Sequence, residues 1–419
     1  MRYSKFISND SKFLQDIKNY IFNVKFNDSF SISADDYCAA LKSHSIKPVF
    51  KLFSLWEDEV IRADLTPYLL SDGELTISYE NGVRSKLSVS LLNTESDWKI
   101  NPSNNFLWKG EKFKFFIGFK TAETEYIYPA GVFILNEFSM SHQYKTNVYS
   151  LELVDKFGGL DGTVGGKTID SVYVPVGSNI FQMTKELLDI EKITGVCYDS
   201  KTIHFPSVQI EQKTPYTINQ SSNSDDNIGA IIKTFATILN CDVYYDRHGH
   251  LTFEESPDNS LVNSKPTVWR FTSDDINFIS PTIEANLQNV YNVIKVEGGN
   301  INGAVMDYTA KNTNPKSPTN ITVFEPTPYK ITDENIASED LAKKRAEYEL
   351  YKRSLLPLSI SFNSILIPHL DVNQVIEIFD PQKQLYNTRF IINSISIPIS
   401  QNSAMTINAT NIEEVAFNE

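Results

Sequence analysis

The glycine-rich stretch Gly158–Thr168, which reads GGLDGTVGGKT, is the part of the sequence that comes nearest to a nucleotide-binding motif. A P-loop needs a glycine five residues before its Gly-Lys-Thr, so that backbone amides surround the phosphate at the start of a helix. Asp161 occupies that position here, and the residues that follow, IDSVYVPVG, are typical of a strand. Because Asp161 would place a carboxylate where the phosphate must lie, we expect a glycine-rich crossover between two domains and no nucleotide site.

His248 and His250 are separated by one residue. In a strand this spacing would turn both imidazoles to the same face, an arrangement that suits a metal ion. No carboxylate or cysteine stands nearby at a supporting spacing, and histidines at the tip of a hairpin are usually solvated. We therefore predict no metal site at this pair.

Two acidic doublets, Glu254-Glu255 and Asp274-Asp275, are the next candidates for chemistry. The members of a doublet point to opposite faces of a strand, so neither doublet forms an acid/base pair, and acids at strand ends are expected to be solvated. The sequence also lacks a G-x-S-x-G, H-E-x-x-H or C-x-x-C motif. It therefore predicts no catalytic residue, no cofactor and no enzymatic activity.

The tryptophans and cysteines support the same prediction. The four tryptophans are scattered among strand-like segments, which favours core packing over a sugar-binding platform. The three cysteines are far apart and odd in number, so we expect free, buried thiols and no disulfide framework. These residues are Trp56, Trp98, Trp108 and Trp269, and Cys38, Cys197 and Cys241.

Composition restricts the partners of the chain. The 419 residues contain 38 Lys and Arg against 52 Asp and Glu, a net charge of −14. Binding to nucleic-acid phosphates needs clustered Lys and Arg, so no specific nucleic-acid binding is expected, although mild acidity suits a wall past which nucleic acid slides. The N-terminus lacks the apolar core of a signal peptide, and no apolar run is long enough to span a bilayer. We expect a soluble protein that assembles in a cytoplasm.

The first dense β region covers residues 49–157 and follows an N-terminal arm, residues 1–48, in which Phe13–Ile21 has the spacing of a short amphipathic helix. Apolar residues alternate over Leu75–Tyr79 and again over Val83–Leu91. Asn81-Gly82 lies between them and tolerates the positive φ angles of a type I′ turn, which predicts a hairpin. Several short strands at this spacing are typical of a sandwich or a barrel.

Residues 158–255 have a different pattern, typical of a small α+β domain. Helices are predicted at Ser178–Ile190 and Ser224–Asn240, each with its serine as the N-cap. The second helix leads directly into Cys241–Glu255, where two strands flank a turn at Asp246–Gly249.

Residues 256–268 are polar and contain two prolines, as in a linker. Residues 269–419 are predicted to form a second β domain, with a strand at Asn289–Gly299, a loop excursion at residues 300–330, and a helix at residues 338–353 capped by Ser338. Ile367–Thr410 closes the chain as a small antiparallel module, since one face of each strand is apolar.

Four stretches resemble phage tail hub proteins. ILNCDVYYDRHGHLTFEE is similar to their helix end, strand and D-x-x-G-x-L-x-F hairpin, and NVYNVIKVEGG to the strand that opens their second barrel. LAKKRAEYEL, followed by IPHLDVNQVIEIFD and RFIINSISIPIS, resembles their closing barrel, with Asn373-Gln374 in place of the usual Gly-Asp. YSLELVDKFGGLDGTVGG resembles the Asp-Lys-x-x-x-Leu-x-Gly passage after the first barrel in phages of Gram-positive bacteria.

The resemblance covers about residues 50–419 and implies a mainly β fold with two tail-tube-like β-barrel domains separated by a small α+β domain. It implies a homotrimeric hub in the virion, at the tail tip or baseplate, that joins the tail tube or distal tail protein to tip, spike or fibre proteins. DNA or the tape measure protein would pass through or plug its channel. Family members with lytic activity carry it in additional C-terminal domains, so none is expected here.

Two other functions stay open. A receptor- or carbohydrate-binding tail component would use exposed tryptophans and tyrosines. A cell-wall hydrolase would need two acids that converge in a groove.

Overall fold

The computed structural model describes residues 5–7, 31–33, 40–41, 46–56, 59–93, 107–121, 125–143, 146–168, 171–190, 203–206, 211–220, 227–255, 265–274, 277–285, 290–301, 304–315, 317, 319–334, 336, 338–354, 358–400 and 404–412. Within these ranges, no helix is both long enough and apolar enough to cross a membrane.

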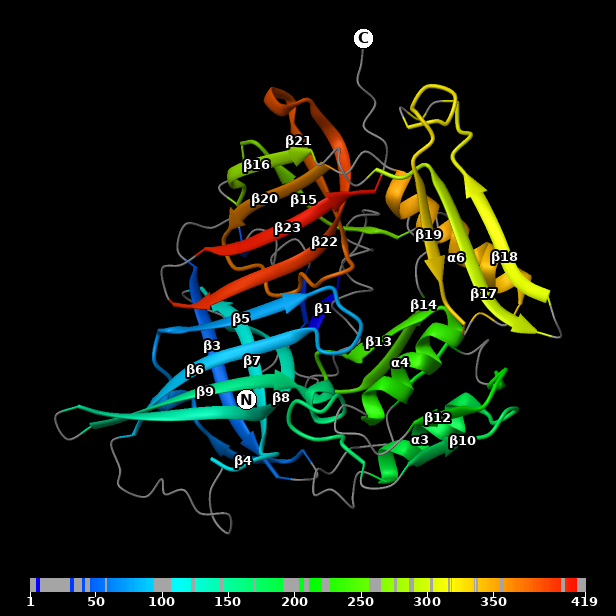
Figure 1. Cartoon of the computed structure of the whole chain (residues 1–419). Coiled ribbons are helices and arrows are strands. Elements are labelled where there is room, and N and C mark those ends of the chain that lie inside the picture. Colours follow the sequence, from blue (N-terminus) through cyan, green and yellow to red (C-terminus); the bar gives the residue numbers. More distant parts are fainter. Residues whose placement is uncertain are drawn as a thin grey trace.

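Thirteen of the described strands form one sheet that contains both β regions (Figure 1). From the first region come β3 (Lys47–Leu55), β4 (Ile61–Asp64), β5 (Gly73–Ser78), β6 (Ser85–Asn93), β7 (Lys112–Lys120), β8 (Glu125–Gln143) and β9 (Thr146–Asp155). From the second come β15 (Thr267–Thr272), β16 (Ile279–Ala285), β20 (Leu358–Ser364), β21 (Val375–Asp380), β22 (Leu385–Ile399) and β23 (Met405–Asn411). The order is β16-β20-β23-β22-β5-β6-β9-β8-β7-β3-β4, and β21 pairs with β22 and with β15.

Strand β22 joins the two β regions. Its first part pairs with β21, and its last part, Ser394–Ile399, pairs with β5, where Ile395 stands opposite Ile77. The register of the β22–β23 pair shifts between Ile392 and Ser394, where the β21 pairing ends and the β5 pairing begins. A bulge of this kind bends a strand, which allows one long strand to serve two partners in succession.

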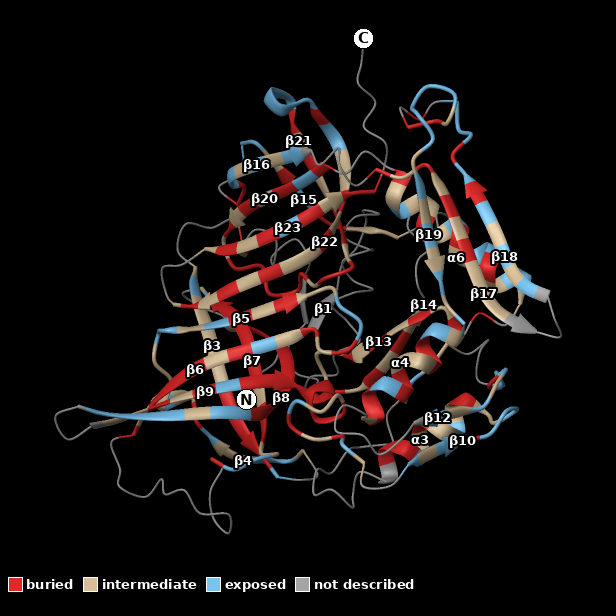
Figure 2. Cartoon of the chain, viewed as in Figure 1, coloured by how far each residue is buried: buried red, intermediate tan, exposed pale blue. Residues whose placement is uncertain are grey.

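The two regions also share a hydrophobic core, and both contribute buried strand residues to it (Figure 2). Leu75 and Phe115 from the first region lie in the same cluster as Phe362 and Ile397 from the second. The mainly β prediction is therefore confirmed. Two separate closed barrels are not found in the described part of the chain, because the pairing of β5 with β22 merges the regions into one sheet.

The hairpin predicted at Asn81-Gly82 is formed by β5 and β6, but its loop is wider than a two-residue turn. Leu75 pairs with Leu87 and Ile77 with Ser85, a register that is centred on Asn81. Gly82 has a φ of 111° and donates its N–H to Val243 in the middle part of the chain at 2.8 Å. Contact with another part of the fold, rather than turn propensity alone, therefore determines the loop.

The middle part of the chain packs two helices against small sheets around its own core. Its elements are η2 (Lys156–Gly159), β10 (Val172–Val174), α3 (Ile180–Ile190), β11 (Ile203–His204), β12 (Ile218–Gln220), α4 (Ile228–Leu239), β13 (Cys241–Tyr245) and β14 (Leu251–Glu255). Both predicted helices are present. Asn179 caps α3 by accepting the N–H of Gln182, where Ser178 was the predicted cap. Asn227 caps α4 by accepting the N–H of Ala230, and the predicted cap Ser224 lies outside the described residues.

A second small unit lies beside the main sheet. Strands β17 (Val293–Ile301), β18 (Ala304–Lys311) and β19 (Pro328–Thr332) form a separate three-stranded sheet, against which α6 (Glu339–Ser354) packs. The strand predicted to open a second barrel is β17, which pairs with β18 and β19 instead. Residues 300–330 were predicted to be a loop excursion, but they contain strand β18. Ser338 caps α6 as predicted, since its Oγ accepts the N–H of Leu341 at 3.2 Å.

In the N-terminal arm, β1 (Lys5–Ile7) and β2 (Ser31–Ser33) pair in parallel. The helix predicted at residues 13–21 lies outside the described residues. The short helices η1 (Thr66–Tyr68) and η5 (Pro381–Lys383) complete the fold.

Candidate functional site

The turn between β13 and β14, Asp246–His250, is the point at which three parts of the molecule meet. One oxygen of the Asp246 carboxylate, Oδ1, accepts the backbone N–H groups of His248 at 2.9 Å and His250 at 2.8 Å. Gly249 has a φ of 85° and donates its N–H to the Asp246 carbonyl at 2.9 Å. An Asp at the start of a turn and a Gly at the left-handed position stabilise this conformation, so the DRHGH sequence itself produces the tight turn.

The first β region holds this turn through Glu59, which pairs with the buried Lys156 of η2. Lys156 Nζ donates to the carbonyl oxygen of Gly249 at 2.9 Å and forms an ion pair with Glu59, which also lies 3.0 Å from Lys112 Nζ. Burial of Glu59 opposes its ionisation. The two ammonium groups outweigh burial and hold the pKa of its carboxyl below the ordinary value. A Cβ on Gly249 would lie 2.8 Å from Val132 Cγ2, so the turn is seated directly on β8.

The second β region holds the same turn through Arg247. Its Nε lies 2.6 Å from Asp371 Oδ2, and its terminal nitrogens donate to the carbonyl oxygens of Pro368, at 2.7 Å, and Leu370. A planar guanidinium with several fixed donors suits this set of acceptors, and a lysine could not reproduce it.

Arg84, in the loop between β5 and β6, contributes a third contact. Its guanidinium carbon lies 3.3 Å from the ring centroid of Tyr244 and 4.8 Å from that of Tyr79. Its NH1 is 4.0 Å from Glu254 Oε2. Burial, reinforced by Asp242, raises the pKa of Tyr79, whose hydroxyl donates to Asp242. The aromatic rings and the charges therefore bind the β5–β6 loop to β13.

Glu254 corrects one prediction. It was expected to be solvated, but its carboxylate accepts hydrogen bonds from Tyr244 at 3.0 Å and from Asn373 at 3.0 Å, and lies 3.6 Å from Lys265 Nζ. Asn373 is one of the two residues that depart from the hub-like pattern, and here it connects β14 to the second β region. Asp274 is exposed, and Asp275 lies outside the described residues.

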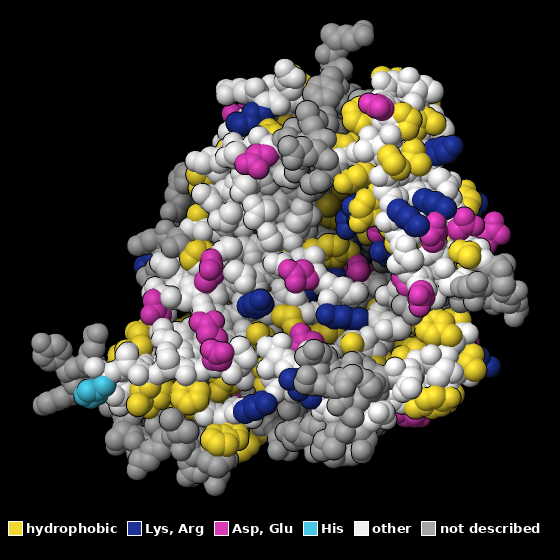
Figure 3. Space-filling model, viewed as in Figure 1, with side chains coloured by type: hydrophobic (Ala, Val, Ile, Leu, Met, Phe, Trp, Pro, Cys, Tyr) yellow, Lys and Arg dark blue, Asp and Glu magenta, His cyan; other side chains and the backbone are white. Residues whose placement is uncertain are grey.

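We call Glu59, Arg84, Lys156, Arg247, Glu254 and Asp371 the three-part junction. Acidic and basic side chains lie close together around the hollow at the centre of the molecule (Figure 3). In the three-part junction, side chains from one part of the fold form ion pairs with, or donate hydrogen bonds to backbone carbonyls of, another part. These contacts fix the orientation of the parts relative to one another.

The glycine-rich stretch Gly158–Thr168 packs within the middle part of the chain. Asp161 Oδ1 accepts the N–H of Thr163 at 3.0 Å, and Gly229 of α4 lies so close that an added Cβ would approach Asp161 Cα to 3.0 Å. Strand β10 follows the stretch, as predicted.

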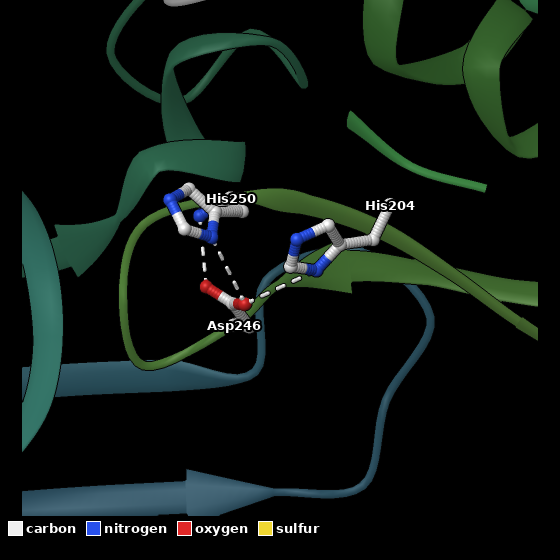
Figure 4. A group of neighbouring side chains, drawn as sticks. All are labelled: His204, Asp246 and His250. Atoms are coloured by element: carbon white, nitrogen blue, oxygen red, sulfur yellow. Dashed lines mark hydrogen bonds and ion pairs between the residues drawn. The ribbon is translucent and has the colours of Figure 1, made fainter. Parts of the chain in front are cut away.

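The histidines are arranged differently from the prediction. Ring nitrogens of His250 and His204, the latter on β11, both approach Oδ2 of Asp246, at 3.4 Å and 3.6 Å (Figure 4). His248 stacks on His250 with ring centroids 5.9 Å apart. The prediction that no carboxylate supports these residues is therefore wrong, because Asp246 turns back toward His250 within the turn. His204 is distant in sequence and belongs to no pattern that would have revealed it.

The tryptophans divide into two groups. Trp269 is buried in the shared core, as predicted, whereas Trp56 is 53% exposed and Trp108 is 43% exposed. Trp98 lies outside the described residues. Arg62 stacks on Trp56 at 4.6 Å and pairs with Glu111 at 3.5 Å, and Glu111 donates its N–H to Trp108. Cys241 is buried and is not part of a disulfide, as predicted, and the other two cysteines are outside the described residues.

Comparison with known proteins bears on the fold. The 43 kDa tail protein of prophage MuSo2 from Shewanella oneidensis matches with a TM-score of 0.56 and 12% identity, over 88% of this chain and 100% of that chain. The tail protein from Neisseria meningitidis MC58 matches with a TM-score of 0.57 and 11% identity, over 88% of this chain and 97% of that chain. The chain therefore has the fold of these phage tail proteins.

The sequence comparisons are more limited. A family described as "Domain of unknown function (DUF5048)" matches residues 325–415, which include β19, α6 and β20–β23. No curated protein matches the sequence.

Proposed function

We propose that this chain is the structural hub of the tail tip or baseplate of a phage or phage-like particle. Three copies form a ring that joins the distal end of the tail tube to the tip, spike or fibre proteins, and the ring lines part of the channel for DNA and the tape measure protein. The observation that carries the proposal is the shared fold, which extends over essentially the whole length of two phage tail proteins. The role is structural and involves no catalysis.

The three-part junction supports this role. A hub must transmit force between the tube and the tip without changing the orientation of its parts. Lys156 and Arg247 hold one turn from two sides, and β22 makes both β regions a single sheet. The acidic balance of the chain, −14, suits a channel wall that does not retain nucleic acid.

The test uses the purified full-length chain. Analytical ultracentrifugation over a range of concentrations, followed by electron microscopy of mixtures with the cognate tube protein, should show a trimer that seats on the end of the tube. A stable monomer at high concentration that does not bind the tube protein would contradict the proposal.

A carbohydrate-binding role is the second candidate, and the exposure of Trp108 and of Trp56, on which Arg62 stacks, favours it. Aromatic side chains that are held in place and exposed provide stacking surfaces for sugars. Binding of the isolated chain to cell-wall glycans that is lost in Trp56→Ala/Trp108→Ala would support this function. The matched variant Tyr386→Ala removes another exposed aromatic side chain, at 58% exposure, and should leave such binding intact.

A further inference from the structure

His204, Asp246 and His250 come from three different positions and converge at one point (Figure 4). His204 ends β11, which pairs in parallel with β14, and Asp246 and His250 lie at the two ends of the turn between β13 and β14. One nitrogen from each imidazole and one carboxylate oxygen all lie within 4.8 Å of one another. In the part of the chain that the structure describes, this is the one group of at least three such side chains with this geometry.

The Asp246 carboxylate is oriented as a metal ligand requires. Its Oδ1 is occupied by the N–H groups of His248 and His250, which leaves Oδ2 facing both imidazoles. Backbone hydrogen bonds that hold one oxygen of a ligating carboxylate are the usual supporting contacts of metal sites.

The two distances that involve Asp246 are close to the separation of ligands around a zinc ion, and the two imidazole nitrogens lie within 4.8 Å of each other. Oδ2 lies 3.6 Å from His204 Nδ1 and 3.4 Å from His250 Nδ1, which is longer than an ordinary hydrogen bond. Ligands about 2.0–2.1 Å from a tetrahedral zinc ion are separated from one another by about 3.3–3.4 Å. Nδ1 of His250 is also buried, and among the described residues it has no hydrogen-bond partner. A cation between these atoms would satisfy it.

We propose that His204, Asp246 and His250 bind a divalent transition-metal ion, with Zn²⁺ as the favoured ion. Two imidazole nitrogens and one carboxylate oxygen are ligands that zinc commonly takes, and they leave one position for water. His204 has a side chain that is 54% exposed, so the site opens to solvent. The ion would link the two-residue strand β11 to the β13–β14 turn. This turn carries Arg247, a member of the three-part junction.

The charges near the three ligands determine the affinity that we expect for the metal ion. Asp246 is the only acid in the set, while Arg247 adjoins it in sequence and Lys114 interacts with it electrostatically. These cations oppose a second positive charge. We therefore expect a reversible site of moderate affinity, in contrast to a tightly closed structural zinc site.

The test is calorimetric titration of the full-length chain, freed of any polyhistidine tag and dialysed against chelator, with Zn²⁺ and in parallel with Co²⁺. We expect one ion per chain and the visible absorption of Co²⁺ in a low-coordinate nitrogen and oxygen environment. His204→Ala and Asp246→Asn should each weaken binding by at least about tenfold, because each removes one of three ligands. Asn at 246 retains an oxygen that can accept the turn hydrogen bonds.

Two matched variants serve as controls. His248→Ala removes the neighbouring imidazole, and His142→Ala removes an exposed imidazole on β8, so both should bind the ion as the parent chain does. Zn²⁺ should also raise the melting temperature of the parent chain and of both controls but not that of His204→Ala. No binding of either ion, or binding that His204→Ala leaves unchanged, would overturn the proposal. His204 is largely exposed, so its replacement should not prevent folding.

Discussion

Nε of Arg247 lies 2.6 Å from Oδ2 of Asp371, and this contact joins the turn after β13 to the segment before β21 across 124 residues of sequence. Arg247 also donates to two backbone carbonyls of the same segment. Together with the contact between Glu254 and Asn373, Arg247 therefore fixes how the middle part of the chain is oriented against the second β region.

Arg247→Ala should lower the free energy of unfolding by about 2–3 kcal/mol, because it leaves a partly buried carboxylate and two carbonyls without their donor. The matched control is Arg270→Ala, since Arg270 is 54% exposed and pairs with Glu377 at 3.1 Å. An exposed pair of this kind contributes about 0–1 kcal/mol. Urea denaturation of both variants measures the difference, and equal losses would contradict the role given to Arg247.

Lys156→Met should be more destabilising, by about 3 kcal/mol, since it removes the ammonium group that Glu59 and the Gly249 carbonyl share in a buried site. The Lys156 side chain is 1% exposed, so water cannot replace it. Adding Glu59→Gln should not restore the loss, because Lys112, whose buried ammonium group lies 3.0 Å from Glu59, would then lose its carboxylate partner. Lys344→Met, which breaks an exposed pair with Asp340, is the control and should change stability by less than about 0.5 kcal/mol. A double variant more stable than Lys156→Met alone would contradict the pairing of Glu59 with Lys112.

His369 should make the protein sensitive to acid. Burial, with the nearby charge of Arg247, lowers the pKa of His369 to about 3. A histidine whose pKa is lowered by folding contributes stability above its unfolded pKa of about 6.5, and this contribution is lost as the pH falls below that value. Stability should therefore decrease by on the order of 2 kcal/mol between pH 7.5 and pH 5.

Denaturation at a series of pH values checks this expectation. His369→Phe keeps a ring beside Trp269, whose centroid is 5.4 Å from that of the imidazole, and should show a shallower loss. His142→Ala, on the surface of β8, should keep the full loss. The same slope in the parent chain and in His369→Phe would assign the acid sensitivity to other groups.

The pairing of Ile395 with Ile77 should make both β regions unfold together. Ile395→Ala should cost about 2–4 kcal/mol, because it leaves a cavity in the shared core, where Ile395 is 1% exposed. In a Trp269→Phe chain, fluorescence reports mainly the first region, and in a chain that keeps only Trp269 it reports the second. Ile395→Ala should lower the denaturation midpoint equally in both backgrounds. A shift seen by only one probe would show that the regions unfold independently.

Local features of the fold could be predicted from the sequence, because short-range chemistry determines them. The apolar spacing located α3 and α4, and the Ser338 cap, which the structure confirms, located the start of α6. Alternation around Asn81-Gly82 located β5 and β6, and the strands that flank Asp246–Gly249 are β13 and β14. In each of these cases, the residues that decide the structure lie within a few positions of one another.

The pairing of distant segments could not be predicted, because the alternation of apolar and polar residues along a strand does not show which other strand it pairs with. The apolar pattern of β22 is equally compatible with closing a second barrel and with joining β5, and the structure shows the second arrangement. Likewise, the sequence spacing draws attention to His248 as the neighbour of His250. The histidine that shares the Asp246 carboxylate with His250 is His204, which the parallel pairing of β11 with β14 brings there. The acceptor position of Asp246 in the DRHGH turn was the one local signal of that site.

The pairing of β5 with β22 also has a consequence for biosynthesis. Ser396 of β22 donates a hydrogen bond to Glu74 of β5, 322 residues earlier in the chain. Until the ribosome has made the intervening residues, the edge of β5 that pairs with β22 has no partner strand. The core residues of the second β region that pack beside it are also not yet present. Contacts between such distant residues slow folding, and exposed strand edges associate with other chains. The first β region is therefore expected to need protection, by a chaperone or an assembly partner, until the last strands are synthesised.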